Sequence, residues 1–243
     1  GNEERGRELL DIAAKAAKQV IDSKAFSLFK PDALKEKAQK YMFILEDAKS
    51  NPAGIQKSAN KEYVFARRYG ESLAPIGKNI TKANLINMVW VSRKFANMYL
   101  CQNGLPIYIN GVKNAQFQEY ATLTSEWENR DNRMRYTLAK PGDYFWNNSN
   151  PGCRLTWNDA SVQSNAAIKN FTPNSGTGYH NQKWASERLV KDNFEGFDYP
   201  IIRYAEVLLN YAEAVYERDG KIEDKDLNIS LNLVRTRVNP NMP

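Results

Sequence analysis

The stretch "YPIIRYAEVLLNYAEAVYERDG", which runs from Tyr199 to Gly220, decides how the chain folds. Apolar or small side chains recur along it at positions 202, 205, 208, 209, 212, 215 and 216. This spacing forms one stripe on a helix of 3.6 residues per turn. Asp219 and Gly220 then supply a stop signal, since glycine commonly follows the end of a helix. The pattern predicts an amphipathic helix over 199–218.

A second amphipathic helix follows at once in "DKDLNISLNLVRTRV". It carries four apolar residues on one face: Leu227, Leu231, Val234 and Val238. Two helices joined by a short turn form a helical hairpin. Ala205 and Ala212 lie two turns apart on the first helix, where their small size lets a partner helix approach closely. The fold class predicted here is mainly α, built from helical hairpins.

The remaining periodicity predicts further helices over 8–23, 32–48, 81–100 and 114–128. In the first of these, the apolar stripe includes Leu9 and Ile12. Within the second, an extended conformation of the apolar run 41–45 is an alternative to helix. A short strand is predicted over 63–67, and "NGLPIYING" at 103–111 is typical of turn, strand and turn. A few short strands therefore accompany the helices.

Residues 141–178 differ from the rest, because they are rich in Gly, Pro, Asn and Ser and show no lasting periodicity. A loop region this long is usually functional or disordered. Aromatic residues set among polar loop residues favour function. We therefore predict an irregular ligand-binding loop region over about 141–178.

Composition and charge exclude several classes of protein. The 243 residues are 42% hydrophobic and 26% charged, which is typical of a folded chain with a sizeable core. No apolar run approaches the roughly 20 residues that a membrane span needs. The net charge of +6 is spread along the chain without a basic stripe or a reading element, so no nucleic-acid partner is predicted.

Cysteine and histidine usage predicts neither a metal site nor a cofactor. Cys101 and Cys153 lie far apart, and His180 is the single histidine, so no zinc-ligand spacing exists. A disulfide between the two cysteines stays open for an oxidising compartment, although free thiols are favoured. No nucleophile motif such as GxSxG accompanies His180, which is typical of a surface residue rather than a catalytic base.

Several blocks of the chain, in order, resemble the SusD/RagB family of outer-membrane nutrient-binding lipoproteins of Bacteroidetes. The blocks are "AAKAAKQVIDSKAFSL" (13–28), "FANMYLCQNGLPI" (95–107), "NRDNRMRYTLAKPGD" (129–143), "GYHNQKW" (178–184), "IIRYAEVLLNYAEA" (201–214) and "LNLVRTR" (231–237). Asn132 stands where the family frequently has proline. Relative to family members, we expect residues 1–243 to be a single SusD/RagB-like domain portion, incomplete at both ends.

The resemblance implies a tetratricopeptide-like scaffold and a non-enzymatic receptor on the outer surface of the outer membrane, held there by a lipid anchor absent from this chain. It implies an oligosaccharide ligand, or a peptide in some members, passed to a SusC-type TonB-dependent transporter. Ligand-binding residues differ between members, so none is carried over to this sequence.

The residues themselves offer candidates for sugar binding within 141–178. An aromatic ring covers the apolar face of a sugar while neighbouring polar side chains hydrogen-bond its hydroxyl groups. Two clusters fit this chemistry; they comprise Tyr144 and Trp146 with Asp143 and Asn147, and Trp157 with Arg154. The alternative, that these rings anchor the loop to the core, stays open.

Glu206 and Glu213 raise the alternative of a glycoside hydrolase, which needs two carboxylates about 5–10 Å apart. Two helical turns span roughly 10.5 Å, so distance does not exclude it. The spacing favours a structural role: Glu206 would pair with Arg203 three residues earlier, and Glu213 with Arg235 or Arg237 on the next helix. We predict no enzymatic activity. A helical-repeat adaptor is disfavoured, because such proteins have short connections.

Overall fold

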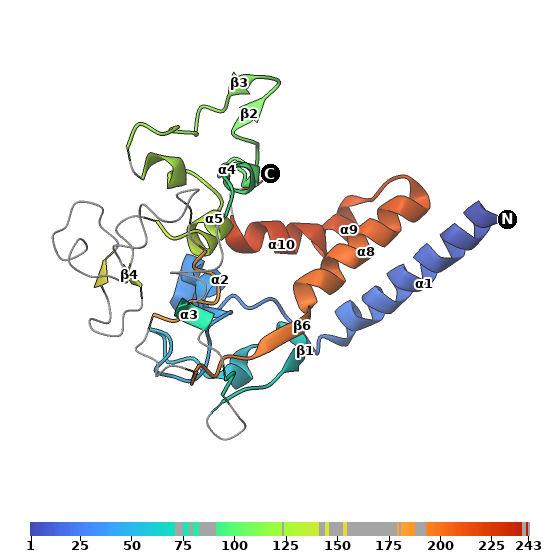
Figure 1. The fold of residues 1–243 in the computed structure, drawn as a ribbon. Coiled ribbons are helices and arrows are strands. Elements are labelled where there is room, and N and C mark those ends of the chain that lie inside the picture. Colours follow the sequence, from blue (N-terminus) through green and yellow to red (C-terminus); the bar gives the residue numbers. More distant parts are fainter. Residues whose placement is uncertain are drawn as a thin grey trace.

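A computed structural model describes residues 1–70, 75–77, 80–82, 91–122, 124–140, 144–145, 153–154, 179, 181–187, 193–239 and 242. Its α-helices are α1 (Asn2–Ser23), α2 (Ala38–Tyr41), α3 (Ile80–Lys82), α4 (Arg93–Met98), α5 (Asn132–Thr137), α8 (Tyr204–Asp219), α9 (Asp224–Asn228) and α10 (Leu231–Val238) (Figure 1). Short 3-10 helices are η1 (Asp32–Lys37), η2 (Lys57–Ala59) and η4 (Ser125–Trp127). Three two-stranded antiparallel sheets pair β1 (Tyr63–Arg67) with β6 (Tyr199–Arg203), β2 (Tyr108–Ile109) with β3 (Val112–Lys113), and β4 (Tyr144–Phe145) with β5 (Cys153–Arg154).

The two longest described helices, α1 and α8, lie side by side and antiparallel (Figure 1). Small side chains make the close approach possible, because Ala14 and Ala17 of α1 and Ala205 of α8 are all buried in one apolar cluster. The expected packing role of α8 is therefore confirmed. The predicted stripe of α1 is partly wrong, since Leu9 and Ile12 are 51% and 53% exposed.

The helix predicted from residue 199 begins at Tyr204 instead. Residues 199–203 form β6, in which Arg203 lies opposite Tyr63 of β1 and Tyr199 lies opposite Arg67. Two β-branched residues in this segment fit a strand better than a helix. The end of α8 is as predicted: Gly220 adopts φ 70°, a left-handed conformation that glycine accepts without strain, and its N–H donates to the Tyr216 carbonyl.

The second predicted helix is divided into α9 and α10 at residues 229–230. Ser230 is fully buried there and its Oγ donates to the main-chain oxygen of Asp226 at 2.5 Å. This bond competes with the helical hydrogen-bond pattern, as serine often does. The helical hairpin of α8 with α9 and α10 is nevertheless formed, and Val234 joins the cluster between α1 and α8.

The single helix predicted over 32–48 is wrong. The chain forms η1, a break at Lys35 with φ 48° and ψ −133°, and then the one-turn helix α2. The apolar run 41–45 is buried in a second cluster together with Phe29 and Phe197. A segment that is apolar on every side is held by tertiary packing, which overrides helical propensity.

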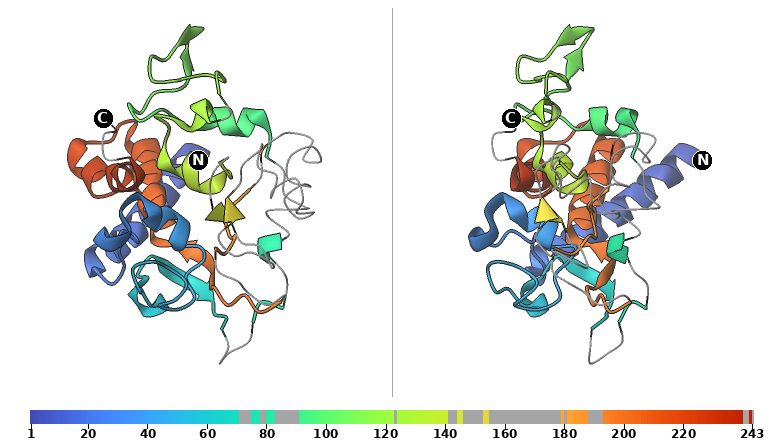
Figure 2. Two further views of the ribbon diagram at one scale, coloured as in Figure 1. Left: turned by 90° about the vertical axis from the view of Figure 1, so that its left-hand side faces the viewer. Right: turned by 60° about the vertical axis from the view of Figure 1, so that its left-hand side comes forward.

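Two predicted helices between 81 and 128 are also corrected. Residues 83–90 lie outside the described part, and 91–92 are non-helical before α4 begins with its cap, Ser92. The described residues of 114–128 form turns and η4, because side chains bond the local main chain. Asn114 Oδ1 accepts from Gln116 N at 3.0 Å, and Ser125 Oγ donates to the Glu119 oxygen at 3.0 Å. The predicted strand and turns near 103–111 are confirmed by the β2–β3 hairpin, which projects from the body (Figure 2).

Two further observations concern membranes and metals. Among the helices of the described residues, none combines the length and apolarity that crossing a bilayer demands. The same residues contain no group of three or more Cys, His, Asp and Glu side chains placed to hold a metal ion.

Candidate ligand-binding site

A fully buried carboxylate, Glu62, joins four parts of the chain. It lies directly before β1 and accepts hydrogen bonds from the main-chain N–H of Phe29 at 2.7 Å, from Arg203 Nη1 at 3.0 Å and from Arg237 Nη1 at 2.5 Å. Its own carbonyl accepts from the N–H of Tyr204, the first residue of α8. A buried charge is stable when paired and hydrogen-bonded, so this centre fixes the entry to α8 and the end of α10.

The ion pairs of Glu62 differ from those predicted from the sequence. Arg203 pairs with Glu62 rather than Glu206, and the arginine of α10 that reaches a buried carboxylate is Arg237. Glu206 and Glu213 are exposed on α8, so they have no need of a buried partner. No ion pair to Glu213 is found among the described residues, and Arg235 is only partly exposed. The structural role predicted for Arg203 therefore operates through another residue.

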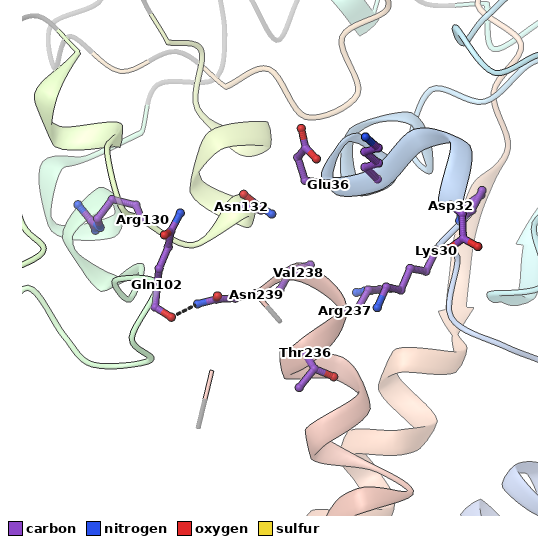
Figure 3. A pocket seen from close by; sticks show the side chains of 12 residues that line it. Lys30, Asp32, Glu36, Gln102, Arg130, Asn132, Thr236, Arg237, Val238 and Asn239 are labelled. Carbon is purple, nitrogen blue, oxygen red and sulfur yellow. Dashed lines mark hydrogen bonds between the residues drawn. The ribbon is translucent and has the colours of Figure 1, made fainter. Parts of the chain in front are cut away.

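Beside the Glu62 centre lies a pocket of about 430 Å³ (Figure 3). Four separated segments line it: residues 30–36 from η1 and the loop before it, Gln102, Arg130 with Asn132, and the last residues of α10 with Asn239. Asn239 ties two of these segments together, since its Nδ2 donates to the Gln102 carbonyl at 2.7 Å. The volume falls in the range of small-molecule sites, about 300–1,000 Å³.

Arg130, one of the residues that line this pocket, directs its hydrogen bonds to main-chain oxygens outside the lining. It is 3% exposed, and its guanidinium donates to four main-chain oxygens, those of Ala96, Tyr99, Leu100 and Glu126, at 2.7–3.4 Å. Burial lowers the pKa of this guanidinium. The next residue, Asp131, caps α5 by accepting from the N–H of Arg133 at 2.8 Å. The segment that resembles the family's Asp-Pro-Arg block thus caps α5 and provides hydrogen bonds to main-chain oxygens near the end of α4.

A second candidate surface lies beside the β2–β3 hairpin and is called here the aromatic surface. It comprises Arg93, Asn97, Tyr108, Phe117 and Tyr120. Tyr108 and Tyr120 are each 46% exposed and pack edge to face on either side of the buried Phe117 ring, at 6.0 and 5.8 Å between centroids. Arg93 covers the Tyr120 ring at 4.3 Å. Exposed rings with neighbouring amide and guanidinium donors fit the chemistry of sugar binding.

Behind the aromatic surface, a buried network holds Arg93 in place. The Tyr179 hydroxyl donates to Glu126 Oε2 at 2.6 Å, and the Arg93 guanidinium lies 5.5 Å from the Tyr179 ring. Burial raises the pKa of Glu126, although Tyr179 and Arg93 act in the opposite direction. The aromatic surface therefore rests on the hydrogen-bonded pair of Tyr179 and Glu126.

Of the loop residues predicted to bind a ligand, only Tyr144 and Arg154 belong to the described part of the chain. Asp143, Trp146, Asn147 and Trp157 lie outside the described residues, as does His180. Tyr144 and Arg154 lie opposite one another in the β4–β5 pair, of which only the main chain is described. All six predicted loop positions therefore stay predictions.

Cys101 is a buried free thiol, and burial raises its pKa. This confirms the preference for a free thiol at position 101. The Cys153 side chain is not among those described.

Sequence reasoning missed the two buried groups that organise the pocket, Glu62 and Arg130. Each has a weak signal: Glu62 directly precedes a predicted strand, and Arg130 lies in the charge cluster that interrupts the periodicity before α5. Neither signal states that the side chain is buried, because its partners come from distant segments of the chain.

Comparison with known proteins identifies a matching family and several similar solved structures. The model of the SusD family matches residues 53–241. Among solved structures, the chain is similar to a SusD-like carbohydrate-binding protein from Bacteroides fragilis, with 22% identity and a TM-score of 0.61, over 98% of this chain and 43% of that one. A further SusD-like protein from the same organism matches at 19% identity and a TM-score of 0.56, over 97% of this chain and 45% of that one. No curated protein sequence matches the chain.

The fold is that of a mainly α-helical, tetratricopeptide-like protein with a few short strands, which confirms the fold class predicted from the sequence. The chain belongs to the SusD family, as the resemblance implied. It spans less than half the length of the two solved relatives described above.

Proposed function

We propose that this protein is a cell-surface receptor that captures an oligosaccharide and delivers it to a SusC-type TonB-dependent transporter in the outer membrane. The observation that carries the proposal is the family match over residues 53–241. The similar structure from Bacteroides fragilis, described as a carbohydrate-binding protein, agrees with this ligand class. In this proposal the receptor performs no covalent chemistry and needs no cofactor, and a lipid anchor holds it on the outer surface of the cell.

Two regions are proposed to contact the sugar. The first is the loop region with Trp146 and Trp157, whose rings would stack on sugar faces. The second is the aromatic surface, where Tyr108 and Tyr120 are half exposed and set on a buried support. Stacking on exposed rings explains how a receptor without catalytic groups could hold a sugar reversibly.

The experiment that tests the proposal is calorimetric titration of a panel of neutral and acidic oligosaccharides, with product analysis on the same samples. Trp146→Ala is compared with Tyr216→Ala, because Tyr216 is a 50% exposed aromatic residue on α8 that belongs to neither proposed region. We expect binding without cleavage. The tryptophan change should weaken it roughly tenfold or more, since burying a large apolar side chain is worth about 1.5–3 kcal/mol, and the control should leave it unchanged.

Three outcomes would contradict the proposal in different ways. Absence of binding to every oligosaccharide would remove the ligand class. Cleavage of a bound glycan would indicate a hydrolase, and its loss in Glu206→Gln or Glu213→Gln would assign the catalytic carboxylate. Equal losses from Trp146→Ala and Tyr216→Ala would mean that the loop tryptophan makes no specific contact.

A further inference from the structure

The pocket beside Glu62 carries an excess of positive charge. Of the described residues that line it, four are cationic and two are carboxylates: Lys30, Lys35, Arg130 and Arg237, against Asp32 and Glu36. No aromatic residue is among them, so the stacking chemistry of the aromatic surface is not what this pocket offers. Its chemistry is that of charge and hydrogen bonding.

The buried side of the pocket is where this positive charge is least compensated. Arg237, whose side chain is 6% exposed, shares the single carboxylate of Glu62 with Arg203. Its Nε is a buried donor without a hydrogen-bond partner among the described residues. Arg130 donates its hydrogen bonds to main-chain oxygens, and no carboxylate of the described residues forms an ion pair with it. Buried charge without a counter-charge is unfavourable, and it favours a nearby anion.

The rim of the pocket holds polar side chains that make no hydrogen bond or ion pair within the described part of the chain. These are Lys30, Asp32, Lys35, Glu36, Gln102 and Asn132. The two amides can each donate and accept, as a sugar hydroxyl does. The two ammonium groups are the donors suited to a carboxylate.

We infer that this pocket binds a carboxylated sugar, that is, a hexuronate unit within an oligosaccharide. The carboxylate would lie toward the lining residues Lys30 and Lys35. The hydroxyl groups would meet Gln102 and Asn132, which lie across the pocket from Lys30 (Figure 3). The inference rests on the proposed function, which it narrows to an acidic glycan. Because the lysines are exposed, binding is expected to weaken as salt is added.

The test titrates the chain with oligogalacturonate and oligoglucuronate trimers, each beside its neutral galactose or glucose counterpart. Lys35→Ala is the variant, and Lys24→Ala is its matched control. Both lysines are exposed and both have positive φ, 48° at Lys35 and 54° at Lys24, but Lys24 ends α1 and does not line the pocket. The two substitutions therefore remove the same charge from exposed positions of positive φ, although ψ is −133° at Lys35 and 15° at Lys24.

We expect at least one acidic trimer to bind about tenfold more tightly than its neutral counterpart, and this preference to shrink when salt rises from 20 to 500 mM. Lys35→Ala should weaken the acidic trimer by about fivefold, near the upper limit for one exposed ion pair, while Lys24→Ala should leave it within about twofold. Lys35→Glu should weaken binding of the acidic trimer further. The thermal midpoints of both Lys35 variants should match that of Lys24→Ala.

Two results would overturn the inference. Equal affinity for acidic and neutral trimers, or equal losses from Lys35→Ala and Lys24→Ala, would mean that the pocket does not select a carboxylate. If the neutral trimers bind and depend on Trp146 in the same assay, the proposed function stands and the acidic site alone is refuted. Binding of no trimer at all would count against both proposals.

Discussion

Replacing Glu62 with glutamine is expected to destabilise the fold by about 3–4 kcal/mol. The carboxylate is fully buried and holds Arg203 at 3.0 Å and Arg237 at 2.5 Å. Removing one partner of a buried ion pair costs on the order of 3–5 kcal/mol, because the remaining charge stays buried without compensation. The Arg203 side chain is 30% exposed and recovers hydration, which places the expected loss in the lower part of that range.

Urea denaturation monitored by circular dichroism provides the measurement. With a slope of about 3 kcal/mol per molar, the midpoint should fall by about 1 M. The matched control is Glu206→Gln, which removes the same charge at an exposed position of α8 and should change the free energy of unfolding by less than about 0.5 kcal/mol. A loss from Glu206→Gln as large as that from Glu62→Gln would refute the reasoning, since Arg203 would then depend on the carboxylate three residues later, in α8.

Two further outcomes are expected. Burial raises the pKa of the Cys101 thiol, so iodoacetamide at pH 8 should leave this residue unmodified in the folded protein and alkylate it in guanidinium. Peptide mass spectrometry provides the readout. Alkylation at equal rates in both conditions would contradict the burial of Cys101. Gly220→Ala should destabilise by about 1 kcal/mol, because φ is 70° there, whereas Gly6→Ala in the interior of α1 should stabilise by about 0.5–1 kcal/mol. Thermal melts of both variants check the pair, and shifts of the same sign would contradict the argument.

The sequence predicted the elements whose signals are local. The end of α8 at Gly220 follows from a single residue type that tolerates a left-handed conformation, and β1 follows from five residues of strand-forming character. Predictions were wrong where distant contacts decide. Residues 199–203 pair with a strand more than 130 positions earlier, and the apolar run 41–45 is buried by packing against Phe197. Local periodicity contains no information on either contact.

The same distinction applies to the candidate site. Aromatic residues in a polar loop, such as Trp146, can be selected from composition, because their chemistry is visible in the residue type. The charge imbalance of the pocket could not be predicted in this way. It arises because Arg237 and Arg203 share one carboxylate and because Arg130 is directed to main-chain oxygens, and both facts depend on which segments meet in space.

The pairing of α1 with α8 has a consequence for how the chain acquires its fold during synthesis. Asp11 of α1 contacts Arg218 of α8 at 2.9 Å, so α1 meets this partner only after the segment between the two helices has also been made. At about 5–20 residues per second, roughly 180 intervening residues take on the order of 10–40 s to appear. Throughout that interval the apolar face of α1 is not buried against α8. Helper proteins that shield unfolded chains would find a binding site on the apolar face of α1 until α8 displaces them.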